Sequence, residues 1–424
     1  MPSPTLPPEL RTEVPGPASR ALAARLTRVE SRNVTCLEPE SPIFWERAQG
    51  SNVWDVDGNR FVDLGAAFAV ANVGHAHPRI VEALNTQNLQ LLHAMGDVHP
   101  AAGKVELLEE LARRFPGGGR ARAVLGSSGS DSVETALKTA LLATGKPGVI
   151  AFEGSYHGMS LGVLENTWRA EFREPFAARL PGHVRFAKYG DLDDLRRVAE
   201  ADDQIIGALL VEPIQGRGGL RVPPDGFMRG LREICDERGW LLIADEVFTG
   251  FGRTGRWFAC EYESVVPDLL CVGKGLASGM PLSACIGTEA VMQAWPASQG
   301  EALHTQTFLG HPPGCAAALA SLAVLEEEKL VEASAENGDF AVDRLRGALS
   351  GNPNVLEVRG RGLMIGVELA SHDLASRVCR EALRNGLILL PAGDDGNVLS
   401  ITPPLSIDRK ALGLALDRLV GCLP

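Results

Sequence analysis

Polar side chains follow directly on several short apolar runs of this sequence, where strands of a sheet would end. Lys274 is the most unusual of them, because it stands between two glycines after the run Leu269–Val272. A lysine amine that is removed from water can be neutral and can form a Schiff base with a carbonyl carbon. The alternative interpretation is an exposed lysine with an ordinary solvated charge.

Two carboxylates occupy corresponding positions. Glu212 follows the run Ile206–Val211, and Asp245 follows the run Leu241–Ala244. A carboxylate at a buried strand end is costly unless it is paired or functional. Asp245 could keep a ring nitrogen of a bound heterocycle protonated. A structural ion pair or a helix cap is the alternative for either acid.

Two loops have a composition that suits a flat, phosphorylated ligand. Gly126–Asp131 reads Gly-Ser-Ser-Gly-Ser-Asp and lies between an apolar run and a helical pattern. Glycine lets the backbone approach a ligand, and a helix N-terminus offers free N–H groups to phosphate. Tyr156, in the loop Glu153–Gly158, could stack its ring on a heteroaromatic. Each loop alone could be an ordinary cap, but the ordered set, with two acids and a lysine, favours a cofactor site.

Short apolar runs separated by helical patterns must position these side chains. Such runs predict a mainly parallel sheet that is covered on both faces. In this kind of sheet, ligands bind beyond the carboxyl ends of the strands. The runs are Ala123–Leu125, Val149–Phe152, Ile206–Val211, Leu241–Ala244, Leu269–Val272 and Ala284–Ile286.

The flanking segments show other patterns. The proline-rich stretch up to about Pro17 predicts a loose arm. Asp57-Gly58 suits a tight turn and predicts a hairpin of Val53–Val56 with Arg60–Leu64. Helical spacing covers Pro78–Phe115. An amphipathic helix ends the chain, with an apolar face of Leu412, Ala415, Leu416, Leu419 and Leu423.

Composition excludes some classes of protein. The 424 residues, 45% hydrophobic and 22% charged, are typical of a globular protein with two domains or one large domain. The net charge of -12, without a basic block, argues against a nucleic-acid partner. No apolar run could span a bilayer, and the first residues lack the basic and apolar regions of a signal peptide. We therefore expect a cytoplasmic protein.

Eight cysteines are scattered along the chain without a Cys-x-x-Cys pair. Without a secretion signal, buried free thiols are expected rather than disulfides or a zinc site. The cysteines are Cys36, Cys235, Cys260, Cys271, Cys285, Cys315, Cys379 and Cys422.

In this order, the motifs resemble those of the class-III, fold-type-I aminotransferases, a family that includes 4-aminobutyrate, acetylornithine and ornithine aminotransferases. The resemblance runs from Val53 to the C-terminus. Its most specific part is Asp245–Gly255, Asp-Glu-Val-Phe-Thr-Gly-Phe-Gly-Arg-Thr-Gly, followed later by Gly273-Lys274-Gly275. Other matching stretches are Trp54–Gly58, Gly74–Pro78, Ser128–Ser130, Tyr156–Gly158 and Glu212–Gly216.

The resemblance implies an α/β fold of fold type I, in which a large domain has a mainly parallel seven-stranded sheet and a small domain is α+β. Residues 67–326 would form the large domain that binds pyridoxal 5'-phosphate. Residues 1–66, an N-terminal arm and part of the small domain, and residues 327–424 would complete the small one. The implied activity moves an amino group from an amine or amino acid to a 2-oxo acid, in a homodimer or a dimer of dimers.

The resemblance also implies roles for matching residues at the reacting end of the cofactor. Lys274 would form the Schiff base with pyridoxal 5'-phosphate and move the proton between substrate and cofactor. Asp245 would pair with the pyridinium nitrogen, which makes the ring an electron sink. Tyr156 would stack on one face of the ring, and Val247 would pack on the other.

The phosphate of the cofactor would be held by the loop before the helix and by a second chain. Gly129 and Ser130 would bind it directly. Thr307, in the stretch Thr307–Pro312, resembles the threonine that reaches the phosphate from the neighbouring subunit. That role requires a homodimer with shared sites.

Four positions depart from the family pattern. Met159 and Ser400 stand where many members have arginines for substrate carboxylates. Phe248 stands where many members have a glutamine near the cofactor hydroxyl. Phe68 stands at an expected pocket position where members often have a smaller apolar residue. These changes argue against 4-aminobutyrate and acetylornithine as substrates.

Glu212 loses its family partner because position 400 is a serine. With Phe68, Met159 and Ser400, we expect it to bind substrate. A buried carboxylate needs a compensating charge, so an ammonium group of the substrate would favour basic amino acids or diamines. The alternative is that Arg217 swings in and pairs with Glu212.

Other activities remain open from the sequence. A few relatives of this fold racemise or epimerise amino acids or lactams, and Pro15-Gly16-Pro17 with Ser19-Arg20 is similar to the opening of such racemases. A decarboxylating lyase is a further alternative, because dialkylglycine decarboxylases share His157-Gly158-Met159. A cofactor-binding protein without catalysis is disfavoured by Lys274.

Overall fold

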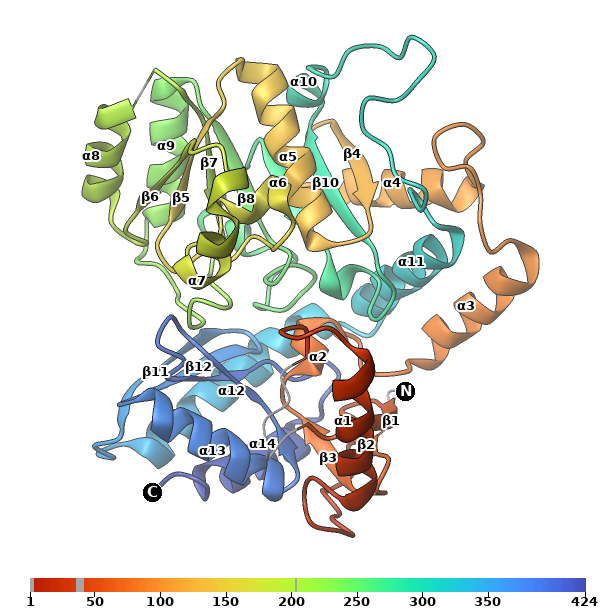
Figure 1. Cartoon of the computed structure of the whole chain (residues 1–424), viewed down its shortest axis with the longest axis vertical. Coiled ribbons are helices and arrows are strands. Elements are labelled where there is room, and N and C mark those ends of the chain that lie inside the picture. Colours follow the sequence, from red (N-terminus) through yellow and green to blue (C-terminus); the bar gives the residue numbers. More distant parts are fainter. Residues whose placement is uncertain (1–3, 36–41, 203) are drawn as a thin grey trace.

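The computed structural model describes residues 4–35, 42–202 and 204–424. Figure 1 shows an upper part made from the middle of the chain and a lower part to which both ends contribute. The described portion contains no helix that is long and apolar enough to cross a membrane.

The upper part is built on a seven-stranded sheet with the order β4-β10-β9-β8-β7-β5-β6. Neighbouring strands run parallel, except that β10 is antiparallel to both β4 and β9. The prediction of a mainly parallel seven-stranded sheet is therefore confirmed. The strands are β4 (Ala121–Gly126), β5 (Gly148–Phe152), β6 (Val184–Ala187), β7 (Ile206–Val211), β8 (Leu241–Asp245), β9 (Leu269–Val272) and β10 (Ser283–Thr288).

Every predicted apolar run lies in one of these strands, and the reason is burial on both faces. In β7, Ala208 and Leu210 pack in one hydrophobic cluster, whereas Leu209 and Val211 pack in another on the opposite face. Only β6 escaped prediction. It lies at the sheet edge, where three of its four side chains are only partly buried, so its sequence shows no continuous apolar run.

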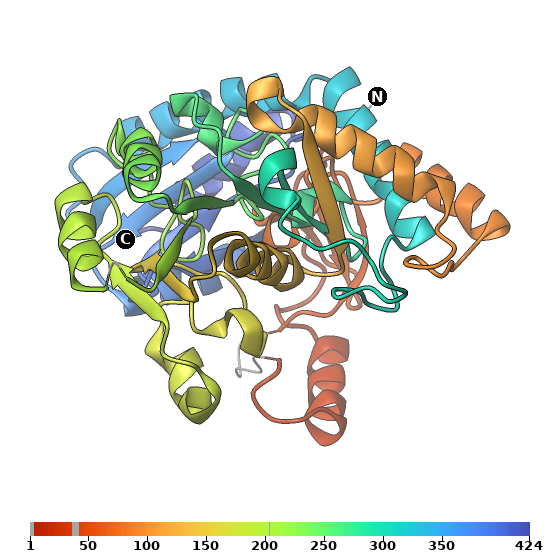
Figure 2. The ribbon, with the colours of Figure 1, turned by 90° about the horizontal axis from the view of Figure 1, so that it is seen from above.

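Helices cover both faces of this sheet. Helix α5 (Gly129–Thr144) packs on one face, against β10, β9 and β4. On the other face α4 (Ala102–Arg114) packs against β4, and α9 (Phe227–Arg238) against β8 and β7. Figure 2 shows the same layers from above, with α1 standing away from the body.

The helical pattern over Pro78–Phe115 is in fact two helices, α3 (Pro78–Gln90) and α4. The helical spacing predicted over this range therefore does not extend to the segment between them. Gly96 and Pro100 lie in this segment, and both residues disfavour a helix interior.

The lower part has two four-stranded sheets, with the orders β1-β2-β3-β13 and β11-β12-β15-β14. The predicted hairpin is present as β2 and β3, which pair antiparallel. The parallel pairing of β3 with β13 joins the two ends of the chain, while the domain boundaries at residues 66/67 and 326/327 stay predictions. The strands are β1 (Trp45–Gln49), β2 (Asn52–Asp55), β3 (Arg60–Asp63), β11 (Val355–Arg361), β12 (Met364–Leu369), β13 (Leu387–Ile388), β14 (Leu390–Ala392) and β15 (Val398–Ile401).

Further helices complete the two parts. The terminal helix was predicted, and Leu412, Ala415, Leu416 and Leu419 on its apolar face are buried. Leu423 was expected on that face but lies beyond the end of the helix and is half-buried. These helices are α1 (Pro17–Val29), α2 (Ala66–Ala69), α6 (Leu161–Leu164), α7 (Ala170–Arg173), α8 (Leu192–Asp202), α10 (Glu289–Met292), α11 (Pro312–Glu327), α12 (Leu330–Leu349), α13 (His372–Arg384) and α14 (Arg409–Val420).

The N-terminal arm is not loose where the structure describes it, from Pro4 onward, so that prediction is wrong. The backbone N–H groups of Leu6 and Arg11 donate to the side-chain oxygens of Asn52 and Asn59, each at 2.7 Å. Asp57 then accepts hydrogen bonds from the first turn of α1. Polar groups of the hairpin thus compensate for the low apolar content of the arm.

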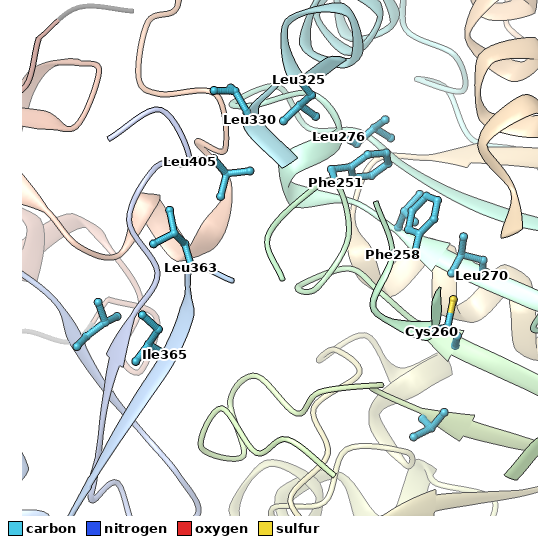
Figure 3. Close-up of a cluster of buried hydrophobic side chains, with 14 of the residues drawn as sticks. Phe251, Phe258, Cys260, Leu270, Leu276, Leu325, Leu330, Leu363, Ile365 and Leu405 are labelled. Atoms are coloured by element: carbon cyan, nitrogen blue, oxygen red, sulfur yellow. The ribbon is translucent and has the colours of Figure 1, made fainter. Parts of the chain in front are cut away.

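A buried arginine and a continuous apolar cluster join the two parts. Arg253 donates to the carbonyl oxygens of Leu363 (3.0 Å) and Pro403 (2.5 Å) and to Oδ1 of Asn72 (2.7 Å). Figure 3 shows the surrounding cluster, in which Leu363 and Leu405 lie on one side of the junction and Phe251 and Phe258 on the other. The position of one part on the other therefore depends on satisfied buried polar groups as well as on apolar contact.

Replacement of this arginine should be strongly destabilising. We expect Arg253→Ala to lower the free energy of unfolding by about 3 kcal/mol, because buried acceptors lose their donor. Chemical denaturation measures the change, with Arg256→Ala, at an exposed neighbouring position, as the control. Equal stabilities of the two variants would contradict this account of the junction.

Candidate active site

The carboxyl ends of β7, β8 and β9 lie side by side, because these strands are adjacent and parallel. Glu212, Asp245 and Lys274 stand at these ends. The charges of both acids raise the pKa of the lysine amine. The structure therefore brings together the three residues that the sequence singled out at strand ends.

Lys274 lies half-buried in a strained position, with a backbone φ of 41°. Its Nζ is 4.0 Å from the centre of the Phe248 ring. Burial lowers the pKa of the amine from 10.5 to about 8, although Asp245 and Glu212 oppose this change. The next residue must be a glycine, because a Cβ at Gly275 would collide with the side chain of Asn72. The result is a nucleophilic amine close to neutral pH.

Asp245 is buried, with 5% of its surface exposed. One carboxylate oxygen accepts a hydrogen bond from the backbone N–H of Val247, at 3.1 Å. The other oxygen lies 2.7 Å from Nδ1 of His157. The buried Nε2 of His157 has no hydrogen-bond partner among the described residues.

The sequence interpretation assigned no role to His157. The available signal was its place in the matching stretch Tyr156–Gly158, after β5, which is adjacent to β7 in the sheet. Contact with Asp245 spans 88 positions in the chain, so only the folded sheet reveals it.

The loop before α5 is a helix cap and also presents free amides. Ser128 and Asp131 form a capping box, and the carboxylate of Asp131 accepts from the N–H groups of Ser127 (2.9 Å) and Ser128 (3.0 Å). The next N–H groups, of Gly129 and Ser130, have no partner within a helix. The cap is therefore observed, whereas the phosphate role of Gly129 and Ser130 stays a prediction.

Val247 lies against this loop. A Cβ at Gly129 would approach Cγ1 of Val247 to 2.9 Å, so a larger residue than glycine would force the two apart. A Cβ at Gly158 would likewise meet Oγ of Ser130. Tight packing thus places the helix N-terminus, Val247 and the Tyr156–Gly158 loop around one space.

Glu212 is buried and accepts two backbone hydrogen bonds, from Tyr156 (2.9 Å) and Gly216 (3.0 Å). Burial raises the pKa of its carboxyl to about 7, with a smaller contribution from the charge of Asp245. The alternative prediction paired it with Arg217, but the structure gives these two described residues no ion pair. The Arg217 guanidinium lies instead 5.0 Å from the centre of the Tyr156 ring.

Four other predicted residues lie at the margins. Phe68 and Met159 are exposed, as is Thr307 in a turn before α11, while Ser400 is half-buried in β15. Within the described chain, none of them forms a hydrogen bond or ion pair with the side chain of Lys274. Their roles stay predictions.

Phe68 is carried on an unusual turn that the sequence did not reveal. Residues 66–69 all have a positive φ, between 45° and 63°, although none is a glycine. Such left-handed turns cost roughly 1–2 kcal/mol per residue. Asp63 supports the turn by accepting hydrogen bonds from the N–H groups of Gly65 (2.8 Å) and Ala67 (3.1 Å).

The cysteines of the described chain are all free thiols. Cys235, Cys260, Cys271, Cys285 and Cys315 are buried and free, Cys379 and Cys422 are half-buried and free, and Cys36 lies outside the described residues. Among the described residues, no group of three or more acids, histidines and cysteines could hold a metal ion.

The side chains fit pyridoxal 5'-phosphate. A desolvated amine suits an aldehyde carbon, a buried carboxylate suits a protonated ring nitrogen, and the free amides of α5 suit a phosphate. Val247 packs against Gly129 at the start of that helix.

Known proteins resemble this chain over nearly its whole length. The family Aminotransferase class-III matches residues 36–423. A 4-aminobutyrate aminotransferase of Mycobacterium tuberculosis is 39% identical over 98% of this chain and 97% of its own length. An acetylornithine aminotransferase of Methanopyrus kandleri is 42% identical over 90% of this chain and 94% of its own length.

A solved structure is also similar over nearly the whole chain. The ornithine aminotransferase of Toxoplasma gondii, described with pyridoxal phosphate at its active site, gives a TM-score of 0.88 at 30% identity, covering 96% of this chain and 94% of its own. These relatives support amino transfer and give no support to the racemase alternative. The chain belongs to the class-III aminotransferases, which are fold-type-I, pyridoxal-phosphate-dependent enzymes that transfer amino groups to 2-oxo acids.

Proposed function

We propose that Lys274 is the lysine through which this aminotransferase binds its cofactor and moves the substrate proton. The observation that carries the proposal is the place of Lys274 after β9, beside the strand-end acids of β7 and β8 and against the Phe248 ring, where burial lowers the pKa of the amine to about 8. At pH 7 about a tenth of such an amine is neutral, and the neutral form can attack a carbonyl carbon. It can also accept a proton from a substrate carbon and return it.

Asp245 holds the ring nitrogen in this proposal. When bound, pyridoxal 5'-phosphate supplies an aldehyde carbon and a ring that takes up the electron pair of the broken C–H bond. Asp245 stabilises the positive charge on the ring nitrogen by proximity. His157 acts as a positioning residue, because its 2.7 Å contact orients the carboxylate.

The remaining cofactor contacts come from packing and from a second subunit. The N–H groups of Gly129 and Ser130 bind the phosphate, while Tyr156 and Val247 enclose the ring. Thr307 is exposed in the single chain and completes the phosphate site of the neighbouring subunit in a homodimer. A cytoplasmic location is part of the same proposal.

The expected substrate pocket departs from the pattern of many family members. Arginines are absent at positions 159 and 400, which argues against 4-aminobutyrate and acetylornithine as preferred donors. Glu212 selects donors with a second ammonium group, while Phe68, Met159 and Ser400 shape the pocket. Basic amino acids and diamines fit this description.

The rate at which the cofactor-free enzyme binds pyridoxal 5'-phosphate covalently should increase with pH, because Lys274 must first lose its proton. Below a pKa of about 8 the amine is protonated, so the rate of covalent binding to the cofactor-free enzyme should rise about tenfold per pH unit and level off above pH 8. The change in cofactor absorbance on covalent binding measures this rate. Lys274→Ala should capture nothing, and a borohydride-reduced adduct on another lysine in that variant would show the assignment to be wrong.

The role of Thr307 can be tested with mixed subunits. Lys274→Ala chains and Thr307→Ala chains, each impaired alone, should recover activity when they are unfolded together and refolded. In the mixed dimer, one site would contain an intact lysine and the intact threonine of the partner. Recovery requires that threonine acts across the interface. A mixture no more active than Thr307→Ala alone would place the threonine in its own subunit's site.

The selectivity of Glu212 should show in its pH dependence. The carboxyl ionises near pH 7, so the kcat/KM for a diamine should rise as the pH increases from 6 to 8. Glu212→Gln should remove this rise and lower kcat/KM for diamines about tenfold, with little change for alanine. An equal loss for every donor would mean that Glu212 supports the fold only.

A further inference from the structure

Arg217 carries a positive charge without an acidic partner. Within the described chain, its guanidinium forms no ion pair and no hydrogen bond, and it is open to solvent. Its carbon Cζ lies 5.0 Å from the centre of the Tyr156 ring and 5.2 Å from that of Phe172. The backbone is held firmly, because its carbonyl accepts a hydrogen bond from Gly393 at 2.9 Å.

This guanidinium is close to the reaction centre. A Cβ at Gly216 would lie 3.0 Å from the Phe248 ring, so the chain just before Arg217 touches that ring. The same ring is 4.0 Å from Nζ of Lys274. The charge of Arg217 also lowers the pKa of Lys274, which agrees with a short separation.

Neighbouring arginines are already occupied. Arg253 is fully buried and donates to three oxygens at the junction of the two parts. Arg169 contacts the carbonyl of Gly393 and lies 3.8 Å from Asp394. Arg359 donates to Gly219 and pairs with Glu357 and Glu368. Their donors are directed at protein oxygens, whereas those of Arg217 are available.

We propose that Arg217 binds the carboxylate of the amino acid and of the 2-oxo acid, in place of the arginines that are absent at positions 159 and 400. The inference rests on the amino transfer proposed above. A guanidinium binds a carboxylate through two parallel hydrogen bonds. Stacking on aromatic rings restricts its motion without using its N–H groups.

The assignment also narrows the substrate class. Arg217 supplies one positive charge, and Glu212, five positions earlier, supplies a negative one. An amino acid with one carboxylate matches this pair of charges, and a second ammonium group would match it further. A dicarboxylate would have one group without a partner.

The test compares donors that differ only in the carboxylate, such as ornithine and 1,4-diaminobutane, or alanine and ethylamine. Half-reactions of the holoenzyme are followed by cofactor absorbance. Arg217→Gln should raise the apparent dissociation constant of the amino acid about tenfold to a hundredfold and leave that of the amine unchanged. The apparent dissociation constant of the amino acid for Arg217→Lys should lie between those of the parent and of Arg217→Gln. Arg221→Gln, a matched change at an exposed arginine of the same loop, should behave like the parent.

A second measurement does not depend on turnover. Pentanoate, an unreactive monocarboxylate, should bind the parent holoenzyme and bind Arg217→Gln at least tenfold more weakly in a calorimetric titration. Equal binding by both proteins would overturn the assignment, as would an equal loss for amines and amino acids or the same loss in Arg221→Gln. If none of the tested donors transfers its amino group to the cofactor of the parent enzyme, the proposed function fails. The pentanoate titration still decides the role of Arg217 in that case.

Discussion

An amine must lose much of its hydration before it can act as a nucleophile near neutral pH, and this requirement organises the structure around Lys274. Two carboxylates nearby favour its charged form, so burial has to outweigh them to bring the pKa to about 8. The left-handed backbone at Lys274, the glycine after it and the Phe248 ring all serve that burial. The junction held by Arg253 maintains it, because it fixes one part of the chain on the other.

Much of the fold was predictable because burial on both sheet faces leaves continuous apolar runs, as in β7 and β9. Prediction failed where the stabilising groups are polar or distant. The edge strand β6 has no apolar run, and the arm is held by Asn52 and Asn59 rather than by its own composition. The left-handed turn at residues 66–69 contains no glycine that could have indicated it.

Some residues of the candidate site could be found from the sequence, whereas others could be found only from the fold. Lys274, Asp245 and the loop at Gly129 could be found because each directly follows a recognisable run. His157 could not be given a role, since its contact with Asp245 depends on the order of strands in the sheet. Arg217 was considered only as a partner for Glu212. Its actual place over Tyr156 depends on Gly393, which comes from the other end of the chain.

The parallel pairing of β3 with β13 has a consequence for synthesis of the protein. Val62 in β3 pairs with Leu387 in β13. The hairpin of β2 and β3 is therefore made early, but β13 can pair with it only after nearly the whole polypeptide has left the ribosome. The seven-stranded sheet is complete by Thr288 and can form during that interval. Until release, β3 presents an unpaired edge that can join other chains. Nascent copies on one message can therefore mispair at their N-terminal hairpins before β13 is made.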